Sequence, residues 1–217
     1  MDILIGVLVV DDHLVVRKGV QALLMDADDI TIVGEAEDGQ AAVAAARRLR
    51  PQVILMDLKL PHLDGVEAIR AILAEQPDVG VVVLTGTDGD EQVLAAVEAG
   101  ALGYLAKTSE REHFLLAIRR VARGELWLPP RLTRKLLAHL KPNSGGGAAE
   151  PLTGRETGVL NLLAKGRTNQ QIAQELNIAD ATVRTHVSHI LDKLGVSNRV
   201  EAALHALRAG VVTLEES

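Results

Sequence analysis

Five side chains capable of phosphate and metal chemistry stand at the ends of short apolar runs. Asp11 and Asp12 follow the first such run, and Asp57 follows the third. Thr85 ends the fourth run, and Lys107 comes shortly after the fifth. Three carboxylates brought together repel one another and attract a hard divalent cation such as Mg²⁺, which prefers oxygen ligands. These residue types therefore predict a magnesium site if the runs are neighbouring strands.

The same set of residues suggests chemistry on a phosphoryl group. A carboxylate beside Mg²⁺ can attack phosphorus and form an aspartyl phosphate, while a hydroxyl and an ammonium can each bind a phosphoryl oxygen. The simpler alternative is that an Asp at a strand end only caps the next helix, but capping explains neither Thr85 nor Lys107. His13 could be a metal ligand; we expect instead that it begins the first helix and is solvated.

Two alternating periodicities in the first 125 residues would position this site. Short β-branched runs predict buried strands, and the segments between them have helical spacing. The alternation predicts βαβ units and a doubly wound parallel sheet, which binds ligands at the carboxyl ends of its strands. The expected strands are 3–10, 30–33, 53–56, 81–84 and 103–105, and the expected helices are 14–25, 40–50, 65–74, 91–99 and 110–123.

Composition narrows the class of protein. The chain has 217 residues, 47% of them hydrophobic and 24% charged, so disorder cannot be its dominant state. It has no cysteine, which excludes a disulfide scaffold, thiol catalysis and any Cys-ligated zinc or iron–sulfur site. The apolar runs are too short for a membrane span, and the N-terminus has no basic region typical of a secretory signal. We therefore expect a cytoplasmic protein that does not act in a membrane.

The net charge of −6 is unevenly distributed. Residues 1–124 hold 20 acidic and 12 basic residues, a net −8, whereas residues 150–217 hold 8 and 7, a net −1. The acidity therefore lies mostly in the first half. The near-neutral second half permits a nucleic-acid role without demanding one.

A second, helical domain is expected after a linker. Residues 131–140 have the pattern of a short helix, and residues 141–150 form a Gly-rich flexible stretch. We therefore expect domains at 1–125 and 151–217, joined by a linker at 126–150. Residues 151–217 have no strand signal and predict a four-helix, all-α domain with helices near 153–165, 169–176, 181–194 and 198–209.

Local signals mark two helix starts in this second half. Thr153 and Glu156 have the spacing of a capping box. Ala179 cannot cap a helix with its side chain, so Asp180 is expected to cap one that begins a residue later. Residues 169–194 suit a helix-turn-helix whose second helix enters the major groove of DNA. The alternative is an ordinary amphipathic helix that packs on a partner protein.

The first half resembles the receiver domain of two-component response regulators, a flavodoxin-like fold. The motifs are Val-Leu-Val-Val-Asp11-Asp12-His13, Leu-Met-Asp57-Leu-Lys-Leu-Pro61, Asp64-Gly65, Leu-Thr85-Gly and Gly-Tyr104-Leu-Ala-Lys107. The resemblance implies that Asp57 is the phosphoacceptor and that Thr85 and Lys107 bind the phosphoryl oxygens. It also implies that Tyr104 is an aromatic switch. The implied Mg²⁺ ligands are Asp12, Asp57 and the backbone carbonyl of Lys59, with Asp11 acting through a water.

The second half resembles the LuxR-type helix-turn-helix, so the whole chain resembles a NarL/FixJ-type response regulator. The motifs are Leu152-Thr-x-Arg155-Glu156-x-x-Val159-Leu160, Gly166-x-x-Asn169-x-x-Ile172-Ala173-x-x-Leu176, Thr182-Val183-Arg184-x-His186-Val187-Ser188, Lys193-Leu194-Gly195-Val196 and Asn198-Arg199. The resemblance implies that Arg184, Thr185 and Ser188 face bases. It places Thr168, Asn169, Gln170, His186, His189 and Lys193 near phosphates, and it gives residues 198–209 to the dimer contact.

These resemblances imply a phosphorylation-switched transcription factor. A sensor histidine kinase would phosphorylate Asp57, and a homodimer would bind an inverted repeat in double-stranded DNA. One rival is a regulator that acts only through protein partners. Another is a Mg²⁺-dependent aspartyl phosphatase, which often has a second carboxylate two residues after the nucleophile. Lys59 stands at that position here, which argues against an enzyme.

Overall fold

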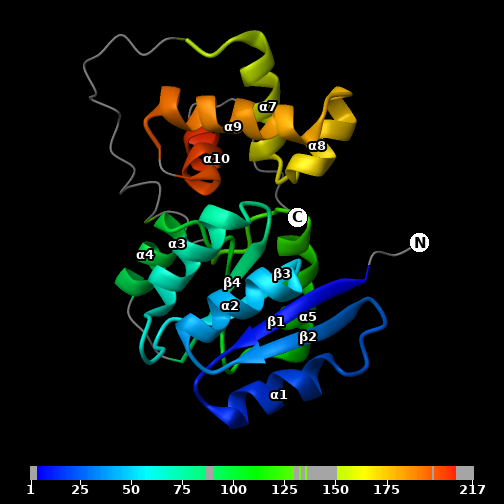
Figure 1. The fold of residues 1–217 in the computed structure, drawn as a ribbon, viewed down its shortest axis with the longest axis vertical. Helices are drawn as coiled ribbons and strands as arrows, with labels where there is room; N and C mark the ends of the chain where they lie inside the picture. The colour runs from blue at the N-terminus through cyan, green and yellow to red at the C-terminus, as the bar shows by residue number, and fades with distance from the viewer. Residues whose placement is uncertain are drawn as a thin grey trace. The chain divides into compact units, whose positions relative to one another are not determined.

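Five parallel strands form one sheet in the order β2-β1-β3-β4-β5 in the computed structural model of the protein (Figure 1). Every neighbouring pair is parallel, as the βαβ pattern predicts. The structure describes residues 4–86, 90–129, 132, 135, 151–196 and 198–208. The strands are β1 (Ile5–Val10), β2 (Ile30–Ala36), β3 (Val53–Asp57), β4 (Gly80–Thr85) and β5 (Gly103–Ala106).

β2 extends furthest beyond its apolar pattern. The sequence predicts β2 only to residue 33, because Gly34 and Glu35 interrupt the apolar run. In the structure, pairing with β1 continues to Ala36 after a register shift between Val7 and Leu8. The strand is extended by hydrogen bonds from its neighbour, which do not depend on apolar side chains.

Five helices cover the two faces of the sheet, with α2, α3 and α4 in succession on one face and α1 and α5 together on the other (Figure 1). Along each strand, alternate side chains enter the two cores. Leu8, Ile54 and Val81 pack with the helices α2 to α4. The helices are α1 (Leu14–Leu24), α2 (Gly39–Leu49), α3 (Gly65–Glu75), α4 (Asp90–Glu98) and α5 (Arg111–Ala122).

The segment after α5 pairs with the open edge of β5. The N–H of Trp127 donates to the carbonyl of Leu102, and the N–H of Tyr104 donates to the carbonyl of Trp127, both at 2.9 Å. The Arg120 guanidinium stacks 5.4 Å from the centre of the Trp127 ring. An unpaired strand edge exposes donors and acceptors, and Trp127 satisfies part of this one. The first compact unit of the chain accordingly ends at Leu128.

Within residues 151–196 and 198–208 of the second unit, the structure has four helices, as the sequence predicts. They are α7 (Gly154–Ala164), α8 (Asn169–Leu176), α9 (Asp180–Leu194) and α10 (Arg199–Arg208). Their apolar faces enclose a core of small and branched residues that includes Val159, Leu160, Leu163, Ile172, Val183, Ile190 and Ala203. The capping box is present, because the Thr153 hydroxyl accepts from the Glu156 N–H and the Glu156 carboxylate accepts from the Thr153 N–H.

The start of α9 differs from the expectation. Ala179 is the N-cap and makes no side-chain capping bond, while Asp180 is the first helical residue instead of the cap. Asp180 instead forms an ion pair with Arg184, one turn further along the helix, at 2.7 Å. A carboxylate in the first turn is favoured by the helix dipole, which compensates for the missing cap.

Two expectations fall on parts of the chain that lie outside the described residues. These are the Gly-rich linker and the short helix at 131–140, of which only Leu132 and Lys135 are described. Within the described part of the chain, no helix combines the length and the apolar character that crossing a bilayer requires.

Candidate functional site

The carboxyl ends of four adjacent strands bring together the predicted site residues of the first unit. Asp11 directly follows β1, Asp57 ends β3 and Thr85 ends β4. Thr85 pairs in register with Ala106 of β5, and Lys107 comes next. The strand order places β1, β3, β4 and β5 side by side, so these residues converge as the sequence predicts.

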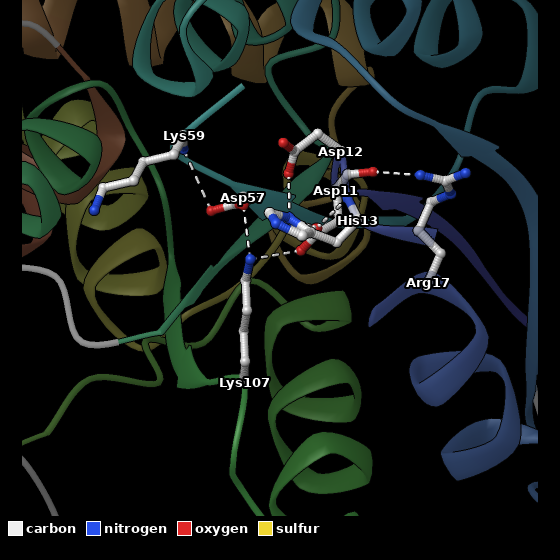
Figure 2. A network of polar contacts seen from close by, with 7 residues as sticks. All are labelled: Asp11, Asp12, His13, Arg17, Asp57, Lys59 and Lys107. Atoms are coloured by element: carbon white, nitrogen blue, oxygen red, sulfur yellow. Dashed lines mark hydrogen bonds and ion pairs between the residues drawn. The ribbon is translucent and has the colours of Figure 1, made fainter. Parts of the chain in front are cut away.

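Lys107 joins two buried carboxylates (Figure 2). Its Nζ lies 2.7 Å from Oδ2 of Asp57 and 2.7 Å from Oδ2 of Asp11, and its side chain is 19% exposed. Burial lowers the pKa of Lys107, but its contacts with Asp11 and Asp57 raise that pKa by more, so it lies above its ordinary value.

The pKa of Asp57 is also raised. Burial is the main cause, and the neighbouring charge of Asp11 adds to it; the contact with Lys107 lowers this pKa but does not offset the increase. One ammonium is thus shared between two buried carboxylates. The site retains excess negative charge that a cation would neutralise.

A divalent cation fits the donor atoms at this position. One ligand atom from each of Asp11, Asp12, His13 and Asp57 lies within 4.8 Å of the others. Oδ2 of Asp11 is buried and accepts no well-directed hydrogen bond, so its contact with Lys107 is an ion pair only. A cluster rich in carboxylate oxygens suits Mg²⁺ better than a softer metal. The acidic cluster is therefore typical of a receiver magnesium site.

His13 matches the solvated alternative. It is the N-cap residue of α1, and its side chain is 68% exposed. Its Nδ1 lies 3.3 Å from Oδ1 of Asp11 and also contacts Asp12. We keep the carboxylates as the candidate metal ligands, because an exposed imidazole at this edge is free to hydrate.

The loop after β3 is held closely against the start of α3. The N–H of Lys59 lies 3.3 Å from Oδ1 of Asp57, and the N–H of Gly65 donates to the carbonyl of Leu58 at 3.0 Å. A Cβ added at Gly65 would lie 2.3 Å from the carbonyl oxygen of Asp57. Only glycine permits this approach of one backbone to another. The sequence showed Asp64-Gly65 as a motif but not this contact.

Thr85 and Tyr104 occupy neighbouring strands beside the acidic cluster. Thr85 is fully buried, and its carbonyl accepts from the N–H of Lys107 at 2.7 Å. Tyr104 is half-buried in β5. The coupled movement expected of this pair stays a prediction.

The three predicted base-facing residues all lie exposed on α9. Arg184, Thr185 and Ser188 are one turn or less apart. The Thr185 hydroxyl donates to the carbonyl of Ala181 at 3.1 Å, and Arg184 pairs with Asp180. An exposed pair at this spacing contributes only about 0.3–0.5 kcal/mol, so Arg184 can exchange Asp180 for another acceptor.

The predicted phosphate contacts have more varied surroundings. Gln170 and His189 are exposed, Thr168 and His186 are half-buried, and Asn169 is buried. Thr168 is the N-cap of α8 and shares a capping box with Gln171. The Lys193 ammonium binds Glu156 at 2.9 Å. All six phosphate roles stay predictions.

Glu156 is buried and accepts hydrogen bonds from two residues, of which the sequence predicts only one. Its Oε2 accepts from the Thr153 N–H at 2.8 Å, the Thr153 hydroxyl at 3.0 Å and the Lys193 ammonium at 2.9 Å. The bond from the Thr153 N–H, followed by that from Lys193, lowers the pKa of Glu156 to about 2. The capping motif predicted the first partner. No local signal could reveal Lys193, which is 37 residues away.

Comparison with known proteins shows which family has this combination of units. Residues 7–119 match the family described as the response regulator receiver domain, and residues 150–206 match the bacterial regulatory proteins of the luxR family. The chain belongs to the two-component response regulators that carry a LuxR-type DNA-binding domain. It is a transcriptional regulator and not an enzyme.

Particular relatives cover nearly the whole chain. The transcriptional regulatory protein LiaR of Bacillus subtilis is 44% identical over 96% of this chain and 100% of its own length. The response regulator protein VraR of Staphylococcus aureus is 39% identical over 96% and 99%, respectively. A solved structure of two RcsB dimers bound to two parallel DNAs is 26% identical over 94% of this chain and 98% of its own, with a TM-score of 0.55.

Proposed function

We propose that the protein carries a signal from a sensor histidine kinase to DNA through phosphorylation of Asp57. Residues 1–125 act as the receiver, residues 126–150 as the linker and residues 151–217 as the DNA-binding domain, in the cytoplasm. The observation that carries the proposal is the buried Asp57 carboxylate, held by Lys107 within a cluster that keeps excess negative charge.

Mg²⁺ is the cation that this cluster would take. Asp12, Asp57 and the backbone carbonyl of Lys59 would hold it, with Asp11 acting through a water. When bound, it supplies positive charge that offsets repulsion between the carboxylates and the phosphoryl oxygens. The clustering of the acidic side chains supports this assignment.

The transfer forms one bond and breaks another. A carboxylate oxygen of Asp57 bonds to phosphorus as the bond from phosphorus to the kinase histidine breaks, and that nitrogen keeps the electron pair. Thr85 and Lys107 bind the phosphoryl oxygens by charge-assisted hydrogen bonds. Movement of Thr85 toward the phosphoryl group opens space behind it. Tyr104 then turns inward, because close-packed interiors leave little empty volume.

Replacement of Asp57 tests the phosphoacceptor. We expect Asp57→Ala to abolish phosphoryl incorporation from a small phosphodonor with Mg²⁺, as measured by intact mass. Asp28→Ala, which removes an exposed carboxylate outside the cluster, should be labelled like the native protein. Full labelling of Asp57→Ala, mapped to Asp11 or Asp12, would show that the assignment is wrong.

For the DNA-binding domain, we propose that a homodimer, paired through residues 198–209, binds an inverted repeat. Arg184, Thr185 and Ser188 read bases, and their exposure on α9 supports this role. The phosphates are contacted by Thr168, Asn169, Gln170, His186, His189 and Lys193. The RcsB dimers on DNA offer a precedent within the same family.

Base reading predicts a sequence-dependent loss of affinity. We expect Arg184→Ala to weaken specific binding by about 1–3 kcal/mol and to relax preference at one base pair in each half-site. Gln170→Ala should weaken binding to all sequences alike. Equal behaviour of the two variants would refute base reading by Arg184. A phosphorylated protein that retained no genomic fragment would favour the regulator that acts only through protein partners.

A further inference from the structure

Arg17 of α1 contacts the loop that carries the first two acidic residues (Figure 2). Its Nη1 donates to the backbone carbonyl of Asp11 at 2.7 Å, and its Nε donates to the Glu35 carboxylate at 3.1 Å. Only 11% of the Arg17 side chain is exposed. The guanidinium therefore connects α1, β2 and the loop after β1.

Helix geometry explains how Arg17 reaches this loop. Arg17 is the fourth residue of α1, and helical side chains tilt toward the N-terminus of their helix. Glu35 lies near the end of β2, in register with Val9 of β1. Burial raises the pKa of Glu35, but Lys18 and Arg17 together lower it by more, so the carboxylate stays ionised and anchors the guanidinium.

The contact with Arg17 orients the peptide between Asp11 and Asp12. A peptide unit is planar, so fixing the direction of the Asp11 carbonyl also fixes the direction in which Asp12 leaves the loop. The Asp11 side chain is held separately, because its Oδ1 accepts from the N–H of His13 at 2.9 Å. Arg17 thus acts on the backbone that presents Asp12 and contacts the acidic cluster at a carbonyl oxygen, not at a carboxylate oxygen of that cluster.

We propose that Arg17 is a positioning residue for the Mg²⁺ site and that it acts by orienting the Asp11–Asp12 peptide against the Glu35 anchor. The inference rests on the proposed function, because it assumes that Asp12 is a metal ligand. A guanidinium could also act through its charge alone, without fixing any geometry. Lysine keeps the charge but lacks the planar pair of nitrogens through which Arg17 bonds Glu35 with Nε and the Asp11 carbonyl with Nη1.

The test measures Mg²⁺ affinity of the full chain by titration calorimetry. We expect Arg17→Gln to raise the dissociation constant about 10-fold, at the low end of what loss of an outer partner costs a metal site. Arg17→Lys should keep most of that defect. Glu35→Gln should produce a smaller increase in the dissociation constant, because it weakens only one of the two contacts of Arg17. Arg119→Gln is the control. Arg119 also bonds a carboxylate, that of Asp29, with distances of 2.7 and 2.8 Å, but neither bond involves this loop.

The dependence of phosphorylation on Mg²⁺ gives a second readout. With a small phosphodonor, Arg17→Gln should need more Mg²⁺ for its half-maximal rate but should regain the native rate at saturation. A native Mg²⁺ affinity in Arg17→Gln would overturn the proposal that Arg17 is a positioning residue. A native Mg²⁺ affinity in Arg17→Lys would also overturn it, because charge alone would then be enough. If Arg17→Gln fails to fold, the Mg²⁺ affinities of Arg17→Lys and Glu35→Gln test the proposal instead, and native affinity in both variants would overturn it. Asp57→Asn tests the magnesium site separately from the role of Arg17. Unchanged Mg²⁺ affinity in that variant would refute the proposed magnesium site itself.

Discussion

Two lysines, one in each unit, bind carboxylates in similarly buried surroundings. Lys107 is 19% exposed and joins Asp11 and Asp57, whereas Lys193 is 17% exposed and binds Glu156. The acids that they contact differ in pKa. Burial and the charge of Asp11 hold the pKa of Asp57 above its ordinary value, while hydrogen bonds from Thr153 and Lys193 lower that of Glu156 to about 2.

The difference separates the site that we propose to be reactive from an ion pair that joins two helices. At the first site, carboxylates outnumber the ammonium, so negative charge remains that a cation or a phosphoryl group can engage. At the second, one carboxylate has both backbone and side-chain donors, and the ion pair fixes the start of α7 to the last turn of α9. A buried acid that keeps uncompensated charge is a candidate functional group, whereas three donors converge on one oxygen of Glu156 and join α7 to α9.

Replacing each lysine is the most sensitive test of the difference between the two sites. We expect Lys107→Met to lower the free energy of unfolding of the first unit by about 3 kcal/mol, since it leaves buried carboxylates unpaired. Mg²⁺ should restore part of the loss by replacing the ammonium. Denaturant unfolding followed through Trp127, the only tryptophan of the chain, reports this unit.

The matched variant is Lys193→Met, followed by circular dichroism. It should be milder, because Glu156 keeps its two bonds from Thr153, and Mg²⁺ should not improve it. Equal losses in the two variants, with equal responses to Mg²⁺, would remove the distinction between the sites.

Replacing one glycine in each unit tests how tightly the two sites are packed. Gly65→Ala places a Cβ 2.3 Å from the Asp57 carbonyl, so it should destabilise the first unit by about 1–3 kcal/mol and slow phosphorylation. Gly158→Ala in α7 meets nothing within 4 Å and should stabilise the second unit by about 0.5–1 kcal/mol. Thermal unfolding measures both. A neutral Gly65→Ala would mean that the loop after β3 adjusts without cost.

The smallest expected effect is a loss of stability of the second unit at acid pH, where Glu156 becomes protonated. The pKa of Glu156 is about 2 in the folded protein, against an ordinary value of 4.5. Because the folded value is the lower one, the stabilisation is complete above pH 4.5 and is lost as the pH falls toward 2. The protection factors of the amides in α7 and α9, corrected for the intrinsic exchange rate at each pH, should therefore fall over this range. Glu156→Gln should lack that part of the pH dependence, and an identical profile in the two proteins would contradict the role given to Glu156.

Local patterns in the sequence determined the order and type of the elements. Short β-branched apolar runs, helical spacing and the Thr153–Glu156 capping box depend on residues close along the chain, and the structure confirms the elements that they predict. The parallel sheet followed from the alternation of strands and helices. The motifs also placed Asp57, Thr85 and Lys107 at strand ends, where the parallel topology gathers them.

The sequence gathered Asp57 and Lys107 at one edge of the sheet, but only the tertiary structure decided which atoms pair there and how many donors each group receives. Other pairs had no such signal: Lys193 and Glu156 are 37 residues apart, and Arg17 and Glu35 are 18 apart. These pairs are set by strand order, helix packing and side-chain reach, and nothing in the local pattern of either partner encodes the other. Burial decided the rest, because the raised pKa of Asp57 depends mainly on desolvation and on the charges of Lys107 and Asp11, which other strand ends supply.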